Sequence, residues 1–535
     1  MPDSVDIPAP ESATTLPAAC SHLATVPTSF LASVTSLLSP PWRLGWSMLR
    51  DTTFESSQSA LADRLGGRGL PEAGIGTVVV VPSITFPTTE LVKIIGIQHY
   101  EERMLFILLW LARPEQRIVY VTSGPIDPTI IDYYLSYLDD PEGARARLRL
   151  VDLGDDRPDA LTRKVLDRPD ALATIAQHIE DPDDACLVTF NVTTAEGALA
   201  GGLGLPLYGP HPTLVALGSK TGSRRVAKAS GVPVLDGEEN LWSIDDVERA
   251  VAELHARRPE VGTYVVKLNN GFSGQGNAIV QAGRVTDASS VFCASEESWA
   301  SFGPKIAAEG AIVEELARAP GMVSPSVQMR IVPGGGAEIV STHDQILGGP
   351  DDQVYLGCRF PARDAYRTVI KARARRIGDF LAEHGVIGTF GMDFIVIPGD
   401  ETQVYLSEIN LRMGGTTHPF LMAQAVTEGV YDENTGELIA GGRAKYYVGT
   451  DNLKSPHYVG LSPARVIAAV SAEGLSFKST SRTGVTLHLL GALPAYGKLG
   501  ATCIGDSREE AEDLYQRLVR ALDALGDARR ARPGS

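Results

Sequence analysis

Short β-branched runs alternate with helical stretches from residue 77 to residue 208, and this alternation restricts the fold more than any other feature of the sequence. Strands are expected at residues 78–81, 118–122, 148–153, 186–191 and 206–208, and helices at 90–111, 128–138, 171–179 and 195–201. Strands that alternate with helices form right-handed βαβ units, which build a parallel sheet. No Gly-x-Gly-x-x-Gly follows the first strand, so a dinucleotide fingerprint is absent.

The length of 535 residues is too great for one core, because domains usually contain ~100–200 residues. Residues 1–75 are rich in Ala, Ser, Thr and Pro and are expected to form a disordered extension, with a short amphipathic helix near 42–61. Three folded units are expected after it, over residues 76–210, 211–450 and 451–535. The last unit is expected to be a small α/β domain.

Charge and cysteine content argue against several classes of protein. The net charge of −17 would repel a polyanionic backbone, so nucleic acid is not an expected partner. The five cysteines are odd in number and widely separated, which is typical of a reduced cytoplasmic protein without disulfides or a zinc site. The acidic N-terminus does not resemble a signal peptide, and no unbroken apolar run of ~20 residues is available for a membrane helix.

Glu408, Asn410 and Arg412 lie at the end of an apolar strand. Side chains alternate along a strand, so Val404, Leu406, Glu408 and Asn410 are expected to share one face. Two oxygen ligands at this spacing can hold one side of a magnesium ion, which accepts few protein ligands and keeps places for phosphate oxygens. The planar fork of Arg412 suits a phosphate or a carboxylate.

Asp393 interrupts the apolar strand that precedes this one. A turn at Gly399-Asp400 would join the two strands and place Asp393 beside Glu408. Because two buried carboxylates side by side are costly without a cation, the hairpin predicts a magnesium site. The alternative is a pair of surface carboxylates on edge strands.

Two lysines and a pair of glutamates precede the hairpin in the sequence. Lys267 ends an apolar strand and leads into the loop 269–277, whose glycines would let backbone N–H groups close over phosphates. Lys220 begins a helix, and residues 312–316 form an apolar strand that ends in acids. Taken singly, these features also fit an ordinary turn, a solvated helix lysine and a plain strand end.

Together, in this order and spacing, these features resemble the ATP-grasp superfamily. The matching residues are Lys220 before Gly231-Val232-Pro233, Lys267 before the glycine loop, Glu314-Glu315-Leu316, Asp393 and Glu408-x-Asn410-x-Arg412. Residues 81–87, 95–103, 413–419 and 489–493 further resemble the pheganomycin-type peptide ligase group, which covers about residues 76–525. The resemblance implies an α/β and α+β multidomain protein, with a Rossmann-like pre-ATP-grasp domain before an ATP-grasp domain of two lobes.

The resemblance also implies an ATP-dependent carboxylate–amine ligase that forms an amide bond through an acyl phosphate. Lys267 and Arg412 would be catalytic, and ATP and one or two Mg²⁺ ions would be the cofactors. The implied ATP contacts are Lys220, Lys267, Ser273, Gly274, Gln275, Gly276, Glu314, Glu315 and Leu316, and the implied magnesium ligands are Asp393, Glu408 and Asn410. Either Glu314 or Glu315 would hold the ribose.

Members of the peptide ligase group join an amidino amino acid to the amino end of a peptide in natural-product biosynthesis. If this carries over, the partners are a carboxylic acid and an amine or peptide. An acidic side chain of the protein should then meet the guanidino group of the substrate. The candidates for that acid are Glu101, Glu102 and Asp344. His343 and His418 are candidates to line the cleft, with a structural role as the alternative, and a homodimer is expected because dimers are common in the superfamily.

Two other interpretations remain open at this point. The first is a biotin-carboxylase-like ATP-grasp enzyme, although no Met-Lys-Met biotinyl site is present in this chain. The second is a catalytically silent nucleotide-binding or scaffold protein. The complete set of acids and asparagine argues against the second, because a silent site has no need of these ligands.

Overall fold

The computed structural model describes residues 52–70, 72–271, 276–334, 336–348, 354–399 and 402–530. The expected extension up to residue 51 and the expected phosphate contacts Ser273, Gly274 and Gln275 lie outside these residues. No helix among the residues described is long and apolar enough to cross a membrane.

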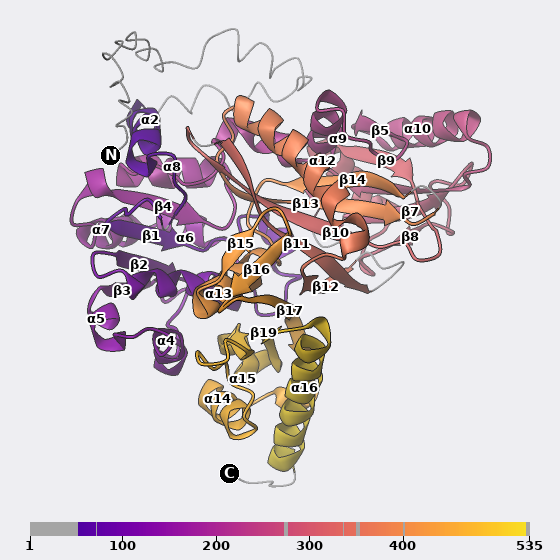
Figure 1. Ribbon diagram of the computed structural model, residues 1–535. Coiled ribbons are helices and arrows are strands. Elements are labelled where there is room, and N and C mark those ends of the chain that lie inside the picture. Colours follow the sequence, from indigo (N-terminus) through magenta and orange to yellow (C-terminus); the bar gives the residue numbers. More distant parts are fainter. Residues whose placement is uncertain are drawn as a thin grey trace, which may run out of the picture. The chain divides into compact units, whose positions relative to one another are not determined.

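The first unit contains a four-stranded parallel sheet, in the strand order β3-β2-β1-β4 (Figure 1). Its elements are β1 (Thr77–Val81), β2 (Arg117–Thr122), α4 (Pro128–Leu135), α5 (Pro141–Ala146), β3 (Leu148–Asp152), α6 (Leu161–Leu166), α7 (Pro169–Gln177), β4 (Ala185–Thr189) and α8 (Thr194–Leu203). The predicted parallel sheet is therefore confirmed. The strand predicted at 206–208 is reduced to a single bridge between Leu187 and Leu207.

The helix predicted over residues 90–111 is wrong as one element, because the chain forms two helices there. α3 covers Thr88–Leu91, and the 3₁₀ helix η2 covers Ile97–Ala112. Gly96 separates them with a φ of 70°, a left-handed conformation that glycine adopts without steric cost. The apolar pattern of this stretch continues across the break, so the pattern alone did not reveal it.

The folded part of the chain also begins earlier than the sequence analysis expected. Helix α2 covers Thr52–Leu65, and its side chains Phe54, Leu61 and Leu65 are buried. Phe54 packs in the same core cluster as Leu199 of α8. Residues 52–70 therefore pack with the first unit instead of extending away from it.

The middle of the chain forms a small lobe followed by a larger sheet. The lobe has five strands in the antiparallel order β5-β9-β6-β7-β8. Its elements are α9 (Lys220–Ala229), β5 (Gly237–Leu241), α10 (Ile244–Arg257), β6 (Thr263–Leu268), β7 (Asn277–Gln281), β8 (Val291–Phe292), α11 (Trp299–Glu309) and β9 (Ala311–Glu315).

The larger sheet has ten strands, and helix α12 (Asp364–Glu383) packs on β10 and β11 (Figure 1). Its strands are β10 (Pro325–Val332), β11 (Gly336–Gly348), β12 (Val354–Phe360), β13 (Gly388–Ile397), β14 (Gln403–Asn410), β15 (Val430–Asp432), β16 (Glu437–Ala440), β17 (Arg443–Lys454), β18 (Gly484–His488) and β19 (Lys498–Gly505). Helices α13 (Thr417–Thr427), α14 (Pro463–Ala472) and α16 (Arg508–Arg530) accompany them. Strand β17 pairs with both β12 and β19, so the proposed boundary at residue 450 falls inside a strand.

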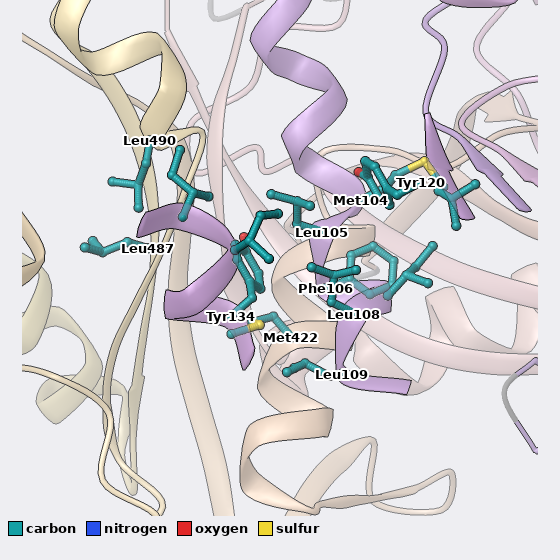
Figure 2. Close-up of a cluster of buried hydrophobic side chains, with 14 of the residues drawn as sticks. Met104, Leu105, Phe106, Leu108, Leu109, Tyr120, Tyr134, Met422, Leu487 and Leu490 are labelled. Atoms are coloured by element: carbon teal, nitrogen blue, oxygen red, sulfur yellow. The ribbon is translucent and has the colours of Figure 1, made fainter. Parts of the chain in front are cut away.

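One buried core joins the first unit to the C-terminal part of the chain. Figure 2 shows Met104, Leu105 and Phe106 of η2 beside Tyr120 of β2, Tyr134 of α4, Met422 of α13, Leu487 of β18 and Leu490. Burial of such large apolar side chains contributes about 1.5–3 kcal/mol each. Helix η2 is therefore held from several sides by apolar contacts.

A tight backbone contact strengthens the same junction. The N–H of Gly491 donates to the Glu102 carboxylate at 3.0 Å, and a Cβ at residue 491 would lie 1.9 Å from that carboxylate. Any larger residue there would displace the Glu102 carboxylate from this contact. Glu102 is thus a structural residue that ties η2 to the segment after β18.

Candidate active site

A cavity of about 760 Å³ collects most of the residues that the sequence analysis selected. The selected residues on its wall are Lys220, Lys267, Glu314, Glu315, Leu316, Asp344, Asp393, Glu408, Asn410 and Arg412. They come from α9, β6, β9, β11, β13 and β14. Gly276 lies in the turn between β6 and β7, where its carbonyl accepts the N–H of Leu268 at 2.9 Å.

Asp393 and Glu408 are direct partners across the β13–β14 pair, as the hairpin predicted. The Asn410 amide nitrogen lies 3.0 Å from Asp393 Oδ2 and 2.9 Å from Glu408 Oε1. Gln345 of β11 donates to Asp393 Oδ1 at 2.7 Å. Four polar side chains from three strands therefore meet at one point of the cavity wall.

The prediction that Val404 and Leu406 share a face with Glu408 and Asn410 is wrong. Phe394 pairs with Leu406 but Asp393 pairs with Glu408, so Ser407 is an extra residue in β14. Such a β-bulge shifts the alternation by one. Val404 and Leu406 are accordingly buried, whereas Glu408 and Asn410 lie on the cavity wall.

The two acids differ in their tendency to ionise. Burial and the neighbouring charge of Glu408 raise the pKa of Asp393 well above its usual value. Burial also opposes the charge of Glu408, but Lys220 and Asn410 outweigh it and hold the pKa of Glu408 below its usual value. A cation between the two carboxylates would remove the repulsion and let both ionise.

Both predicted phosphate lysines already contact carboxylates. Lys220 pairs with Glu408, and its ammonium group also donates to the carbonyl of Gly271 at 3.0 Å. Lys267 pairs with the buried Glu314, whose other oxygen lies 3.1 Å from Arg224. The charges of this region therefore balance one another within the protein.

Two backbone amides of the segment Glu314–Leu316, which was expected to hold the adenine through its backbone groups, are engaged within the protein. The N–H of Glu315 donates to the carbonyl of Asp236 at 2.9 Å, and the N–H of Leu316 donates to the carbonyl of Thr263 at 3.1 Å. An adenine at this segment would therefore meet carbonyl groups rather than these two amides. The Glu315 carboxylate lies 2.6 Å from Arg258.

Arg412 lies at the edge of the acid pair. It donates to Asn410 Oδ1 at 2.9 Å and to the carbonyl of Met413 at 3.0 Å. Asn410 thereby links the guanidinium group to both carboxylates. An arginine in this position can neutralise negative charge that develops beside the acids.

The substrate candidates divide into one cavity residue and four structural ones. Asp344 lies on the cavity wall and accepts from Tyr366 at 2.6 Å. His343 is fully buried and bonds Tyr447 at 2.6 Å, so it does not line the cleft. Glu101 likewise accepts from the backbone N–H of Ser123 at 2.7 Å, away from the cavity.

His418 also lies behind the cavity wall, in a buried group with Asp451 and His488. Its Nε2 lies 2.9 Å from Asp451 Oδ1, and Nε2 of His488 lies 2.8 Å from the same oxygen. Burial lowers the pKa of His418 to about 4. The second oxygen of Asp451 pairs with Arg103, which does reach the cavity.

Sequence reasoning missed several cavity residues that carry charge or hydrogen bonds. They are Tyr100, Arg103, Gln345, Lys454 and Lys498. Tyr100 and Arg103 lie in the stretch 95–103, which resembles the peptide ligase group. The resemblance assigned no function to either residue. The others have no local signal, because they come together only through the pairing of distant strands.

Two family models match parts of this chain. The model described as "IQCH-like, ATP-grasp" matches residues 213–291 and 285–434, and the model described as "PGM1 C-terminal domain" matches residues 465–518. The chain is also 30% identical over 459 residues to the L-propargylglycine--L-glutamate ligase of Streptantibioticus cattleyicolor. That alignment covers 83% of this chain and 94% of the relative.

Solved structures share the fold at low sequence identity. A biotin carboxylase complex from Campylobacter jejuni matches with a TM-score of 0.52 at 12% identity, covering 82% of this chain and 89% of the other. The ADP complex of an N5-carboxyaminoimidazole ribonucleotide synthetase matches with a TM-score of 0.50 at 13% identity, covering 84% and 97%. At this identity, the likeness concerns the fold alone.

Proposed function

The chain belongs to the ATP-grasp superfamily, within its pheganomycin-type peptide ligase group, and from this we propose that it joins the carboxyl group of one amino acid to the amino group of another, or of a peptide, in natural-product biosynthesis. It is an ATP-dependent ligase. ATP would phosphorylate the carboxylate, and the amine would then displace phosphate from the acyl phosphate.

One observation carries this proposal: the acids of two neighbouring strands meet a lysine from the other lobe inside the cavity. Asp393 and Glu408 are cross-strand partners, and Lys220 of α9 pairs with Glu408. Carboxylates and a lysine together suit a nucleotide triphosphate with its metal, because phosphoryl transfer depends on positioning and charge stabilisation.

The donor set fits Mg²⁺. Asp393 and Glu408 offer hard carboxylate oxygens, and Asn410 would offer its amide oxygen once it turns from its present contact with Arg412. Mg²⁺ usually takes one or two carboxylates together with phosphate oxygens. We assign these residues as the ligands of one or two ions. The metal would neutralise phosphate oxygens, and Arg412 would stabilise the charge on the acyl phosphate.

Lys220 and Lys267 are assigned to the ATP phosphates. Each would exchange its present carboxylate partner for a phosphate oxygen. The carbonyls of residues 314–316 would receive the adenine amino group, since two amides there are engaged. Glu315 is held by Arg258 and Glu314 by Lys267 and Arg224, so either acid must change partner before it can bind ribose.

The substrate classes follow from the relative named for L-propargylglycine and L-glutamate. We propose an amino acid as the acid and an amino acid or peptide as the amine. If one of them carries a guanidino group, Asp344 is the acid on the cavity wall that would meet it, because Glu101 and Glu102 are engaged elsewhere.

The two other interpretations have weaker support. The biotin carboxylase alternative has only the fold likeness behind it, whereas the ligase relative matches over most of both chains. A silent scaffold would not need the hydrogen-bonded set of Asp393, Glu408 and Asn410. We further propose a cytoplasmic location, in keeping with free, buried thiols such as Cys186 and Cys503. A homodimer is proposed because dimers are common in the superfamily.

The test is an ADP-release screen of amino acids and guanidino acids against amino acids and short peptides, with products identified by mass spectrometry. A parallel reaction replaces the amine by hydroxylamine, which traps an acyl phosphate as a hydroxamate. We expect ADP release that depends on Mg²⁺ and on the acid, together with an amide product. ADP release that instead requires bicarbonate, without hydroxamate or amide, would contradict the proposal.

A further inference from the structure

Three cations meet on the cavity wall where η2, β17 and β19 come together. They are Arg103, Lys454 and Lys498, called here the cationic corner. Lys454 and Lys498 are direct partners across β17 and β19. The Arg103 guanidinium carbon lies 4.3 Å and the Lys498 ammonium nitrogen 4.8 Å from the centre of the Tyr100 ring. Arg103 and Lys498 therefore share one tyrosine ring, and Lys454, which is exposed, pairs with Lys498 across the two strands.

The charges of the cationic corner are not balanced within the described protein. Lys498 is only 8% exposed, and its contact is the hydroxyl of Tyr100. Arg103 pairs with Asp451, and no carboxylate of the described residues forms an ion pair with Lys454 or Lys498. Three cations and one carboxylate leave a net charge of +2.

This arrangement is unfavourable without an anion. Like charges directly opposite each other on neighbouring strands destabilise the pair. A buried cation without a partner costs more than an exposed one. In addition, Nε of Arg103 is buried and has no hydrogen-bond partner among the described residues. The corner thus has both spare positive charge and a spare donor.

Arg103 is also held in place by its surroundings. Asp451 holds Arg103 with one oxygen while His418 and His488 donate to the other, at 2.9 and 2.8 Å. Helix η2, which carries Tyr100 and Arg103, rests on the apolar core of Figure 2. Side chains held in this way lose little entropy when an anion binds.

We propose that the cationic corner binds the carboxylate of the amine-bearing substrate, most favourably a dicarboxylic amino acid, and this rests on the proposed function. The carboxylate that reacts must lie beside Arg412 and the metal ligands, whereas the carboxylate of an amino acid that supplies the amine does not react and can be held elsewhere in the cavity. Arg103 and Arg412 lie on the wall of the same cavity. An amine anchored at Arg103 would therefore share that cavity with the acyl phosphate.

The net charge sets the preferred ligand. Two carboxylates would balance a charge of +2, whereas a neutral amide would leave the lysines uncompensated. The ATP phosphates are assigned to Lys220 and Lys267, which lie on α9 and β6 and are separate from the corner.

The experiment compares the full-length protein with Lys498→Gln, Lys454→Gln and Lys478→Gln, the last a control at an exposed lysine outside the cavity. Amide formation is measured with L-glutamate, L-glutamine and the α-amide of L-glutamate as amines. The unchanged protein should prefer the free acid. Lys498→Gln should raise KM for L-glutamate roughly 10- to 100-fold, because hydrogen bonds to charged groups contribute about 1.5–3 kcal/mol.

The preference for the free acid over its α-amide should fall by a similar factor in Lys498→Gln and by less in Lys454→Gln, while Lys478→Gln keeps it. An unchanged preference in both cavity variants would overturn the corner as a carboxylate site. A rise in KM for ATP with the preference retained would assign the lysines to the nucleotide and overturn it too. Absence of hydroxamate and amide from the unchanged protein would instead overturn the proposed function, and the corner's role with it.

Discussion

The phosphate corner (Lys220, Lys267, Glu314 and Glu408) and the cationic corner share one cavity but balance their charges in opposite ways. In the phosphate corner, each lysine pairs with a carboxylate of the protein. In the cationic corner, Lys498 contacts a tyrosine hydroxyl and faces Lys454 across the strands. The first region holds its own counter-ions, and the second has to obtain them from a ligand.

This difference indicates how each region would respond to ligands. ATP at the phosphate corner would replace ion pairs that already exist, so binding would rearrange side chains. A carboxylate at the cationic corner would meet donors already in place. Removal of a charge should consequently have opposite effects on stability in the two regions.

Glu408→Ala is expected to have the largest effect. It removes one of two carboxylates from the proposed metal set and leaves Lys220 without its partner. ADP formation should fall about 10⁴-fold, which corresponds to about 5 kcal/mol in the barrier. A coupled ADP assay measures this, with circular dichroism to check the fold and Glu437→Ala on β16 as the control. Undiminished turnover in Glu408→Ala would remove this residue from the site.

Glu314→Ala tests the buried ion pairs of the phosphate corner. The variant leaves Lys267 buried without its carboxylate and Arg224 with Glu239 as its remaining acid, so the free energy of unfolding should fall by roughly 3–5 kcal/mol. Urea denaturation measures the change. Glu315→Ala is the matched control: its partner Arg258 is half exposed, and the loss should be about 1 kcal/mol or less. Equal losses in both variants would contradict the distinction.

Arg412→Gln tests charge stabilisation at the acyl phosphate. A single well-placed donor of this kind contributes roughly 2.7–4 kcal/mol, so kcat should fall about 10²- to 10³-fold while KM for ATP changes little. Steady-state kinetics separate the two constants, and Arg465→Gln, at an exposed position of helix α14, should behave like the unchanged protein. If only KM for ATP rose, Arg412 would belong to nucleotide binding instead.

Lys498→Met should have the smallest effect on folding and completes the comparison. Because no described carboxylate loses its partner, the free energy of unfolding should change by about 1 kcal/mol or less, or increase. Thermal and urea unfolding of the ligand-free protein measure this. A loss as large as that of Glu314→Ala would show that the charge of Lys498 is already compensated inside the protein.

Local sequence patterns predicted the parts of the site that lie on neighbouring strands. The turn between two apolar strands was enough to place Asp393 beside Glu408. The alternation failed at Ser407, because a bulge depends on how β14 pairs with β13 rather than on the residue itself. Gly96 shows the same limit, since the apolar pattern continues through the break between α3 and η2.

The cationic corner could not be predicted from local patterns at all. Tyr100 and Arg103 lie some 350 residues from Lys454 along the chain, and strand pairing rather than spacing brings Lys454 to Lys498. His418 was a candidate cleft residue within the stretch 413–419 that resembles the peptide ligase group, with a structural role as the alternative. It turned out to support Arg103 through Asp451, a relation that only the folded core creates.

The course of strand β17 has a practical consequence for protein engineering. A chimera joined at residue 450 would divide this strand between two parents, because the residues that pair with β12 lie at 447–449, whereas Leu453 and Lys454 pair with β19. A junction at Gly429, between α13 and β15, would move β15 to β19 as one block. Such a swap would import Asp451 and both corner lysines but keep the host's Arg103. Donor and host would therefore have to be compatible at the ion pair between Arg103 and Asp451. Only then could a new substrate preference be transferred.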